Sequence, residues 1–282
     1  MSVNANTEKA GAQAGDDLSG RVADRMWHEL RARFPEAELG RMRGLLDVLG
    51  ERRTPVLEPM QGVKHGLFMP DLPSSPWMER GVFAELAGDL ERLFPELRAE
   101  VLRESAREAF RPYGNLAGEA PVVREAEGWD ELRLWEDLHP TEVALRFPVA
   151  VRALSAIVAR CSLVNSVMLL SMKPGTRLAP HHDRANWYVS VHMGLVVPPK
   201  CAIRVGGEAR TWEEGRCMVF DNSYEHEAWN DGDATRIILA VHLAHPDLTA
   251  TEREAIRLLH HRYQSLMAVG PEAMAAWASV KE

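Results

Sequence analysis

The chain has 282 residues, of which 46% are hydrophobic, so it can build a substantial core in one large domain or two modest ones. A net charge of −8 without a dense Lys/Arg run excludes nucleic acid as the main partner. The polar N-terminus lacks the apolar stretch of a secretory signal, and no segment approaches ~20 apolar residues, so we expect a cytoplasmic protein without a membrane span. Three cysteines without a CxxC pair are expected to be buried thiols, and the oligomeric state is left open.

The N-terminal part of the chain is predicted to be helical. Residues 1–18 are rich in Ala, Gly and Asn and are expected to form a flexible tail. Apolar residues then recur at helical spacing through most of 19–115, with Pro35 and Pro95 each expected to open a new helix. The five prolines of segment 51–80 predict an ordered loop instead.

A mostly β core is predicted for residues 116–248, where a helix follows Pro148 and the hydrophobic period changes from 3.6 to 2 after Cys161. Several short strands with turn residues between them are typical of a sandwich or barrel. The expected strands are 131–136, 164–171, 176–182, 187–195, 201–206, 209–212, 216–220 and 235–243. C-terminal helices are predicted for 249–282, starting at a capping box of Thr251 and Glu254.

A metal site is predicted from three residues of this core. His181 and Asp183 are two positions apart, so on a strand both side chains project from the same face. His226, on a later segment, would complete a set of two imidazoles and one carboxylate. This set is the facial triad of non-haem Fe(II) oxygenases, which leaves open positions for a co-substrate and O2.

A co-substrate anchor is predicted beside the metal. Arg236 shares one face of its strand with His242, and a guanidinium inside a barrel is costly unless a carboxylate meets it. The distal carboxylate of 2-oxoglutarate would be that partner. His192 is expected to hydrogen-bond the other carboxylate, and His182, on the opposite strand face from His181, is read as structural.

Other interpretations of these residues remain open at the level of the sequence. His181 and His182 are also compatible with a surface turn, and His226 with a half-buried core histidine. Arg236 has three acidic neighbours in sequence that would suit a simple ion pair: Glu227, Asp231 and Asp233. His242 and His245 end a strand, and a structural role is preferred for both.

The stretch from about Met172 to Leu248 resembles the aspartyl/asparaginyl β-hydroxylase family of Fe(II)- and 2-oxoglutarate-dependent oxygenases. The resembling pieces are KPGTRLAPH (173–181), HMGLVVP (192–198), RVGGEARTWEEG (204–215), FDNSYEHEAWN (220–230) and RIILAVHLAHPDL (236–248). The upstream piece GLFMPDLPSSPW (66–77) is similar to bacterial members. The resemblance implies a double-stranded β-helix, or distorted jelly roll, with His181 and His226 on iron and His192 and Arg236 on 2-oxoglutarate.

The chain departs from the vertebrate type of this family at three places. Asp183 stands where those enzymes carry glycine, and so restores the full triad. Ser190, which we assign to the co-substrate site, stands where they carry an arginine, so one contact is absent or is supplied by Arg177, Arg184 or Arg204. The serine expected near the start of the core strand is matched by Leu170, with Ser171 one position away.

These observations predict a dioxygenase that hydroxylates an unactivated C–H bond of a small amino-acid-like, carrier-bound or peptidyl substrate. It would use Fe(II), 2-oxoglutarate and O2, with Arg204 and Trp187 as substrate contacts. A lipid A acyl-chain hydroxylase is one alternative. A non-oxidative cupin-like metal isomerase or ligand-binding protein is another, and Arg236 discriminates against it because such a protein needs no buried arginine there.

Overall fold

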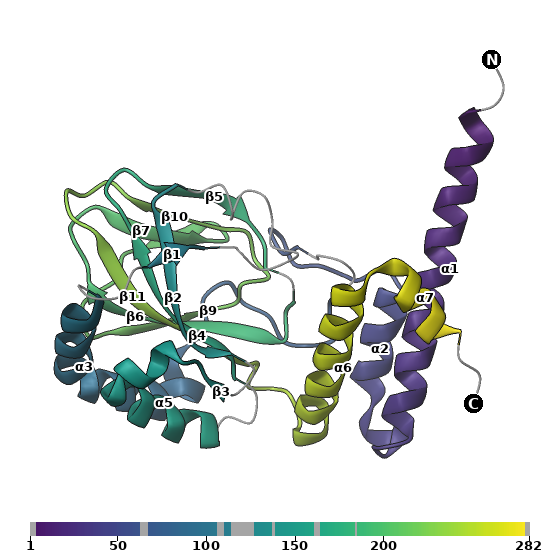
Figure 1. Ribbon diagram of the computed structural model, residues 1–282, viewed down its shortest axis with the longest axis horizontal. Coiled ribbons are helices and arrows are strands. Elements are labelled where there is room, and N and C mark those ends of the chain that lie inside the picture. The colour runs from purple at the N-terminus through teal and green to yellow at the C-terminus, as the bar shows by residue number, and fades with distance from the viewer. Residues whose placement is uncertain are drawn as a thin grey trace. The chain divides into compact units, whose positions relative to one another are not determined.

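The computed structural model describes residues 4–62, 67–105, 110–113, 127–136, 139–160, 164–183 and 185–279 (Figure 1). Two compact units emerge from the contacts between residues. The first comprises Met1–Leu57, Val63–Pro73 and Asp247–Glu282, and the second comprises Glu58–Gly62 and Ser74–Pro246. Each unit is described by itself.

The first unit is helical. It contains α1 (Asn4–Arg31), η1 (Glu36–Glu38), α2 (Gly40–Leu49), α6 (Ala250–Val269) and α7 (Pro271–Ala278). Helix α1 runs through most of the stretch predicted to be a flexible tail, where frequent alanines favour a helix. The N-terminal and C-terminal helical segments, predicted as separate regions, thus form one unit.

The start of α6 differs from the predicted capping box. Thr249 and Glu252 form it, because the Glu252 N–H donates to Thr249 Oγ1 at 3.1 Å and the Thr249 N–H donates to the Glu252 carboxylate at 2.8 Å. The same carboxylate accepts a hydrogen bond from Arg41 Nε at 2.7 Å. Packing against α2 therefore selects the cap two residues before the predicted pair, Thr251 and Glu254.

The second unit consists of two antiparallel sheets and their covering helices. Its helices are η2 (Arg80–Phe83), α3 (Ala84–Ser105), η3 (Val143–Arg146) and α5 (Pro148–Arg160). The larger sheet has the order β1-β2-β4-β11-β6-β9, with β3 paired to β2, and the smaller sheet has the order β5-β10-β7-β8. The strands are β1 (Arg111–Pro112), β2 (Trp129–Glu136), β3 (His139–Pro140), β4 (Val164–Met172), β5 (Arg177–His181), β6 (Tyr188–Val196), β7 (Cys201–Val205), β8 (Glu208–Arg210), β9 (Cys217–Phe220), β10 (His226–Asn230) and β11 (Arg236–Ala244).

From β4 onward the chain passes back and forth between the two sheets, which is the winding of a double-stranded β-helix. The strands β4, β6, β9 and β11 belong to the larger sheet, and β5, β7, β8 and β10 belong to the smaller one. The predicted fold class, a distorted jelly roll with helices at both ends of the chain, is therefore confirmed.

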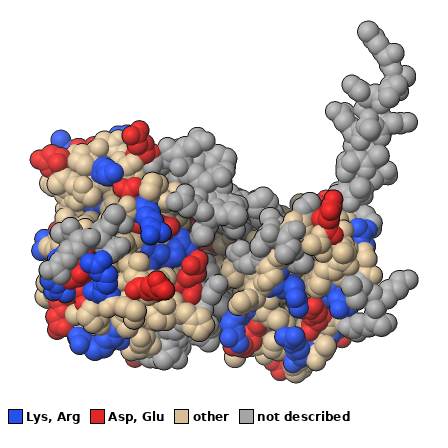
Figure 2. Space-filling model, in the orientation of Figure 1, with Lys and Arg blue, Asp and Glu red and all other residues tan. Residues whose placement is uncertain are grey.

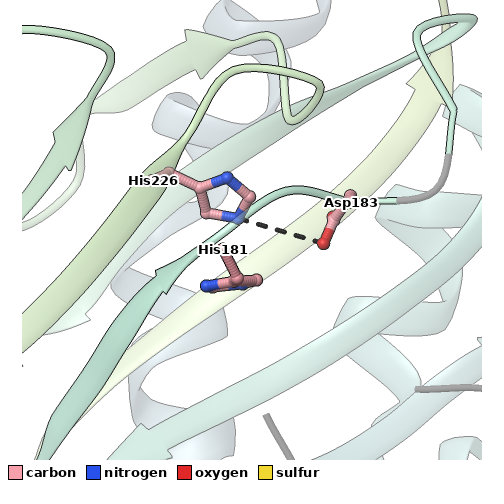
Figure 3. Close-up of side chains that lie close together, drawn as sticks. All are labelled: His181, Asp183 and His226. Atoms are coloured by element: carbon pink, nitrogen blue, oxygen red, sulfur yellow. Dashed lines mark ion pairs between the residues drawn. The ribbon is translucent and has the colours of Figure 1, made fainter. Parts of the chain in front are cut away.

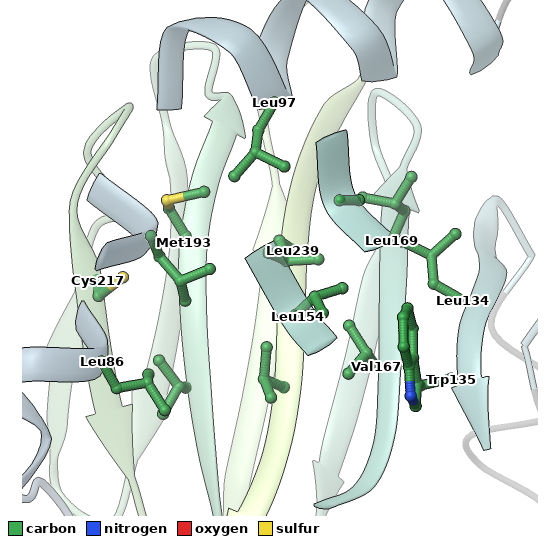
Figure 4. Packing of buried hydrophobic residues seen from close by; sticks show 14 of the residues in the cluster. Leu86, Leu97, Leu134, Trp135, Leu154, Val167, Leu169, Met193, Cys217 and Leu239 are labelled. Carbon is green, nitrogen blue, oxygen red and sulfur yellow. The ribbon is translucent and has the colours of Figure 1, made fainter. Parts of the chain in front are cut away.

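Both faces of the central strands β4, β11 and β6 of the larger sheet are buried, which explains why these strands are apolar at most positions. Leu169 and Leu239 point outward and pack with Leu97 of α3 and Leu154 of α5 in one core cluster (Figure 4). The alternate residues point inward and form a second cluster between the sheets, which includes Met168, Leu170, Ile203, Phe220 and Ile238. The functional residues predicted on β11 lie on this inner face.

Two elements differ from the prediction. Pro95 lies inside α3 and does not open a new helix. The apolar stripe of Leu86, Leu90, Leu97 and Val101 continues in phase across the proline, so packing against the sheet offsets the lost hydrogen bond. Strand β10 was not predicted as a strand, although it carries His226.

No helix of the described chain combines the length and apolarity that a membrane span requires. On the face drawn in Figure 2, acidic and basic side chains are interspersed over the described surface of both units. That face therefore offers no broad basic area of the kind that binds nucleic acid.

Candidate active site

Two histidines lie side by side on the inner face of the smaller sheet. His181 ends β5 and is the direct cross-strand neighbour of His226, the first residue of β10. Their ring centroids are 4.2 Å apart, and both side chains are buried. Nδ1 of His181 donates to the carbonyl of Ala179, and Nδ1 of His226 donates to the carbonyl of Tyr224, each at 2.9 Å. These bonds leave Nε2 of each ring as the nitrogen that can bind a metal.

Asp183 joins the two histidines from the segment that follows β5 (Figure 3). Its backbone N–H donates to the carbonyl of Asn222 at 2.9 Å, and Asn222 Nδ2 donates to Asp183 Oδ2 at 2.8 Å. The second oxygen, Oδ1, lies 3.9 Å from His226 Nε2. Asn222 thus holds one carboxylate oxygen and directs the other toward the histidines.

The electrostatics of this cluster favour an ionised carboxylate. Burial raises the pKa of Asp183, but the fields of His226, His181 and His242 and the hydrogen bond from Asn222 outweigh it, so the pKa falls to about 2. A carboxylate that is already ionised binds a cation without first losing a proton.

The three side chains form a donor set that fits a mononuclear metal ion. One ligand atom from each of His181, Asp183 and His226 lies within 4.8 Å of the other two. Each residue is also held through its second polar atom, as is typical of metal ligands. Two imidazoles and a carboxylate are the ligands of the facial triad, which leaves coordination positions for reactants.

The cluster opens into a cavity between the two sheets. Its walls are mainly apolar and come from both sheets, for example Met168, Leu170, Leu178, Ile203, Phe220 and Ile238. The polar residues of the wall include Ser190, His192, Arg236 and His242. A few polar groups in an apolar wall are typical of a small-molecule site.

Arg236 is the most unusual residue of this wall. It is 1% exposed, and no described residue offers it a carboxylate or a hydrogen-bond acceptor. Its guanidinium lies over the ring of Trp212, with Cζ 4.5 Å from the centroid. Burial lowers the pKa of Arg236 to about 10, which still leaves it protonated at neutral pH. A buried cation without a protein partner calls for an anionic ligand.

His192 and Ser190 lie on β6 and also face the cavity. Nδ1 of His192 is buried without a hydrogen-bond partner among the described residues. Burial lowers the pKa of His192 well below its usual range, and His242 and Arg236 lower it further, so the ring is neutral. A neutral imidazole can donate one hydrogen bond to a bound carboxylate.

The structure places the predicted substrate residues elsewhere. Arg204 points away from the cavity, because its neighbour Ile203 faces inward, and its Nε donates to Glu227 at 2.6 Å. Its Nη2 pairs with Glu225 at 3.1 Å. Trp187 is buried but does not line the cavity. The predicted substrate roles of Arg204 and Trp187 are therefore not supported by their positions.

Of the arginines considered as substitutes for the missing family arginine, neither Arg177 nor Arg204 lines the cavity. Arg177 is exposed and pairs with Asp231 at 2.6 Å, Arg204 is held as above, and Arg184 lies outside the described residues. Leu170 faces the cavity, whereas Ser171 does not.

Sequence reasoning missed several residues of the cavity wall. His242, read as structural, lines the cavity together with the aromatic residues Tyr113, Trp129 and Trp212. The signal for His242 was present, since it shares the period-2 face of Arg236. Tyr113 and Trp129 stack with ring centroids 4.1 Å apart, but they are distant in sequence and lie outside the recognised motifs.

Known proteins were compared with the whole chain. The family model of aspartyl/asparaginyl β-hydroxylase matches residues 91–246, more than half of the chain. The aspartyl/asparaginyl β-hydroxylase of Mus musculus is 33% identical over 193 residues, 66% of this chain and 25% of that protein. Aspartate β-hydroxylase domain-containing protein 2 of Homo sapiens is 30% identical over 200 residues, 67% of this chain and 52% of that protein.

The chain thus spans about a quarter of the first relative's length and half of the second's. Among solved structures, a Trichoplax adhaerens prolyl hydroxylase in complex with a hypoxia inducible factor peptide aligns with a TM-score of 0.41 at 13% identity, over 57% of this chain and 90% of that one. A likeness of this size says nothing about activity. The match over residues 91–246 contains all three members of the His–Asp–His cluster as well as Arg236, and on this basis the chain belongs to the aspartyl/asparaginyl β-hydroxylase family.

Proposed function

We propose that the chain is an Fe(II)- and 2-oxoglutarate-dependent dioxygenase that hydroxylates a C–H bond of a peptidyl or amino-acid-like substrate. The observation that carries the proposal is the buried, unpartnered guanidinium of Arg236 in the same cavity as a two-histidine, one-carboxylate set. Membership of a hydroxylase family supports it.

In this proposal His181, Asp183 and His226 hold the iron. Arg236 pairs with one carboxylate of 2-oxoglutarate, and His192 donates a hydrogen bond to the same molecule. Iron and 2-oxoglutarate, when bound, supply the oxidising chemistry with O2, and 2-oxoglutarate leaves as succinate and CO2. The protein's part is to bind and orient them, and its apolar walls exclude water from the reacting centre.

Arg236 also separates this function from its main rival. A non-oxidative cupin-like isomerase or ligand-binding protein can use the same metal ligands, but it has no need of a buried cation with no protein partner. For lipid A hydroxylation, no observation on the described part of the chain favours an acyl chain over a peptide.

A direct test is the visible charge-transfer band that Fe(II) and 2-oxoglutarate give together when oxygen is excluded. We expect the wild type to show the band and Asp183→Ala to lose it or to need far more iron. Asp231→Ala is the matched control, because Asp231 pairs with the exposed Arg177 and does not line the cavity. A wild type without the band, or an Asp183→Ala variant with a normal one, would contradict the proposal.

Substrate class is then read from a succinate-release screen over free amino acids, acyl compounds and capped peptide units, with the product mass measured for each hit. A mass increase of one oxygen atom supports hydroxylation. Succinate formation without a change in the added compound would show that the compound is not the substrate.

We also propose a cytoplasmic location. Cys201 and Cys217 are buried thiols that form no disulfide with each other, and the Cys201 thiol donates to Asn230 Oδ1 at 2.9 Å. Cysteines kept as thiols are typical of proteins in a reducing compartment. Detection of the native protein in a membrane or periplasmic fraction would contradict this location.

A further inference from the structure

His242 is the last cavity-facing residue of β11, and none of the roles above uses it. It is half-buried and shares the inner face of the strand with Arg236 and Ile238. Its direct cross-strand neighbours are Ser166 on β4 and Ser190 on β6. The histidine therefore lies between two buried serines at one end of the cavity.

The surroundings of His242 fix its ring but leave hydrogen-bonding capacity open. Nδ1 lies 3.1 Å from Ser166 Oγ, which orients the imidazole. No other hydrogen bond to the His242 ring, and none to the Ser190 hydroxyl, is made by the described residues. Nε2 of His242 and the hydroxyl of Ser190 can therefore both serve a ligand.

The position of His242 separates it from the carboxylate anchor. Arg236 and His242 are six positions apart on β11, which corresponds to about 20 Å at roughly 3.3 Å per residue. This separation of the two Cα positions is several times the length of a five-carbon dicarboxylate. A molecule held by Arg236 therefore ends near His192, which pairs with Ala240 between the two.

The electrostatic couplings agree with this order along the strand. Burial lowers the pKa of both His192 and His242, but Arg236 adds to the effect at His192, whereas Arg133 adds to it at His242. The Asp183 carboxylate acts in the opposite direction on both rings. The Asp183 carboxylate therefore lies near both histidines, and of the two rings Arg236 acts on that of His192.

We propose that His242 and Ser190 form the substrate end of the cavity, where they hydrogen-bond an uncharged polar group of the substrate such as a peptide amide. Ser190, which the sequence assigned to the co-substrate site, thereby serves the substrate instead. The inference rests on the proposed function, in which 2-oxoglutarate occupies Arg236. Arg236 is the only Lys or Arg among the described residues that line the cavity. Arg133, whose charge acts on His242, does not line it and is paired with Glu131 and Glu136, so a substrate carboxylate would find no unpaired cation among the described residues at the His242 end. Neutral imidazole and hydroxyl groups suit an amide, which both donates and accepts.

The test compares His242→Ala, His242→Gln, Ser190→Ala and Arg236→Ala with the wild type. The probes are N-acetyl amino-acid N-methylamides and the matching free amino acids, and succinate release and product mass are measured. The anaerobic Fe(II)/2-oxoglutarate band gives the dissociation constant of 2-oxoglutarate for each variant. His242→Gln keeps a donor and an acceptor on a side chain of similar reach, so it tests rescue.

We expect the wild type to hydroxylate at least one amide, and His242→Ala to lower kcat/KM for that amide roughly 10- to 100-fold, mainly through KM. Its affinity for 2-oxoglutarate stays unchanged, and His242→Gln regains most of the loss. Arg236→Ala instead loses affinity for 2-oxoglutarate and keeps its kcat/KM for the amide. If His242→Ala does not fold, Ser190→Ala carries the test, since it is expected to lower kcat/KM for the amide without affecting the affinity for 2-oxoglutarate.

Three results would overturn the assignment: an unchanged kcat/KM in the His242 and Ser190 variants, a loss of 2-oxoglutarate affinity in His242→Ala as large as in Arg236→Ala, or a wild type that forms the band but acts on no amide. Absence of the band in the wild type would instead remove the proposed function itself. The two failures are therefore distinguishable.

Discussion

Replacing Arg236 by methionine is expected to stabilise the protein in the absence of 2-oxoglutarate and to abolish stabilisation by 2-oxoglutarate. Burial of the guanidinium lowers its pKa from 12.5 to about 10. At roughly 1.4 kcal/mol per pKa unit, this shift corresponds to about 3 kcal/mol. Because the folded state disfavours the charged form, the cost is present at neutral pH and disappears only as the pH rises above about 10.

The contact with Trp212 offsets part of this cost. A desolvated cation–π pair contributes about 1 to 2 kcal/mol, so the net gain for Arg236→Met is about 1 to 2 kcal/mol. Methionine fills much of the same space without a charge. For a unit of this size, 1 kcal/mol shifts Tm by about 2 to 4 °C, so we expect a rise of about 2 to 8 °C.

The assay is thermal unfolding with Mn(II) in place of iron, with and without 2-oxoglutarate. With 2-oxoglutarate at 100 times its Kd, the wild type is stabilised by about 2.7 kcal/mol. The wild type then becomes more stable than Arg236→Met. Arg177→Met, which removes an exposed ion pair with Asp231, is the control and should change stability by less than about 1 kcal/mol. A variant that is less stable without 2-oxoglutarate, or is stabilised by it as the wild type is, would refute the reasoning.

Three further outcomes follow from other contacts. Asn222→Ala should weaken Mn(II) binding about 10- to 100-fold in a calorimetric titration, because Asn222 holds Asp183 Oδ2; unchanged affinity would contradict this role. Burial raises the pKa of Asp221 to about 6, so the stability that its protonation contributes is present below about pH 4 and is lost as the pH rises through 6. In urea unfolding, the free energy of unfolding of Asp221→Asn should therefore rise relative to that of the wild type between pH 5 and pH 8. Gly194→Ala should destabilise the fold by at least about 2 kcal/mol, because the new Cβ would lie 2.5 Å from the carbonyl oxygen of Glu213, and an unchanged urea midpoint would count against it.

Packing and partner contacts decided details that the local pattern predicted differently. Pro95 reads as a helix start, yet the apolar stripe on both sides of it keeps α3 continuous. The sequence predicted that Arg204 contacts the substrate, but ion pairs with Glu225 and Glu227 hold its guanidinium outside the cavity. Strand β10 escaped prediction because HEAWN lacks β-branched residues, and its pairing with β5 and β7 makes it a strand.

The sequence by itself determined the periods of the elements and therefore which side chains share a face. The alternation along β11 placed Arg236 on the inner side of the sheet. The two-residue spacing of His181 and Asp183 made it possible for both side chains to bind one metal ion. Only the tertiary structure decided that β5 pairs with β10, which brings His226 opposite His181 across 45 positions of the chain. It also decided that no described residue accepts a hydrogen bond from Arg236 or pairs with Nδ1 of His192, whereas Arg204 pairs with two glutamates. Local periodicity follows from backbone geometry, but strand pairing and the neutralisation of charges depend on residues that are distant in sequence and meet only when the two sheets close on each other.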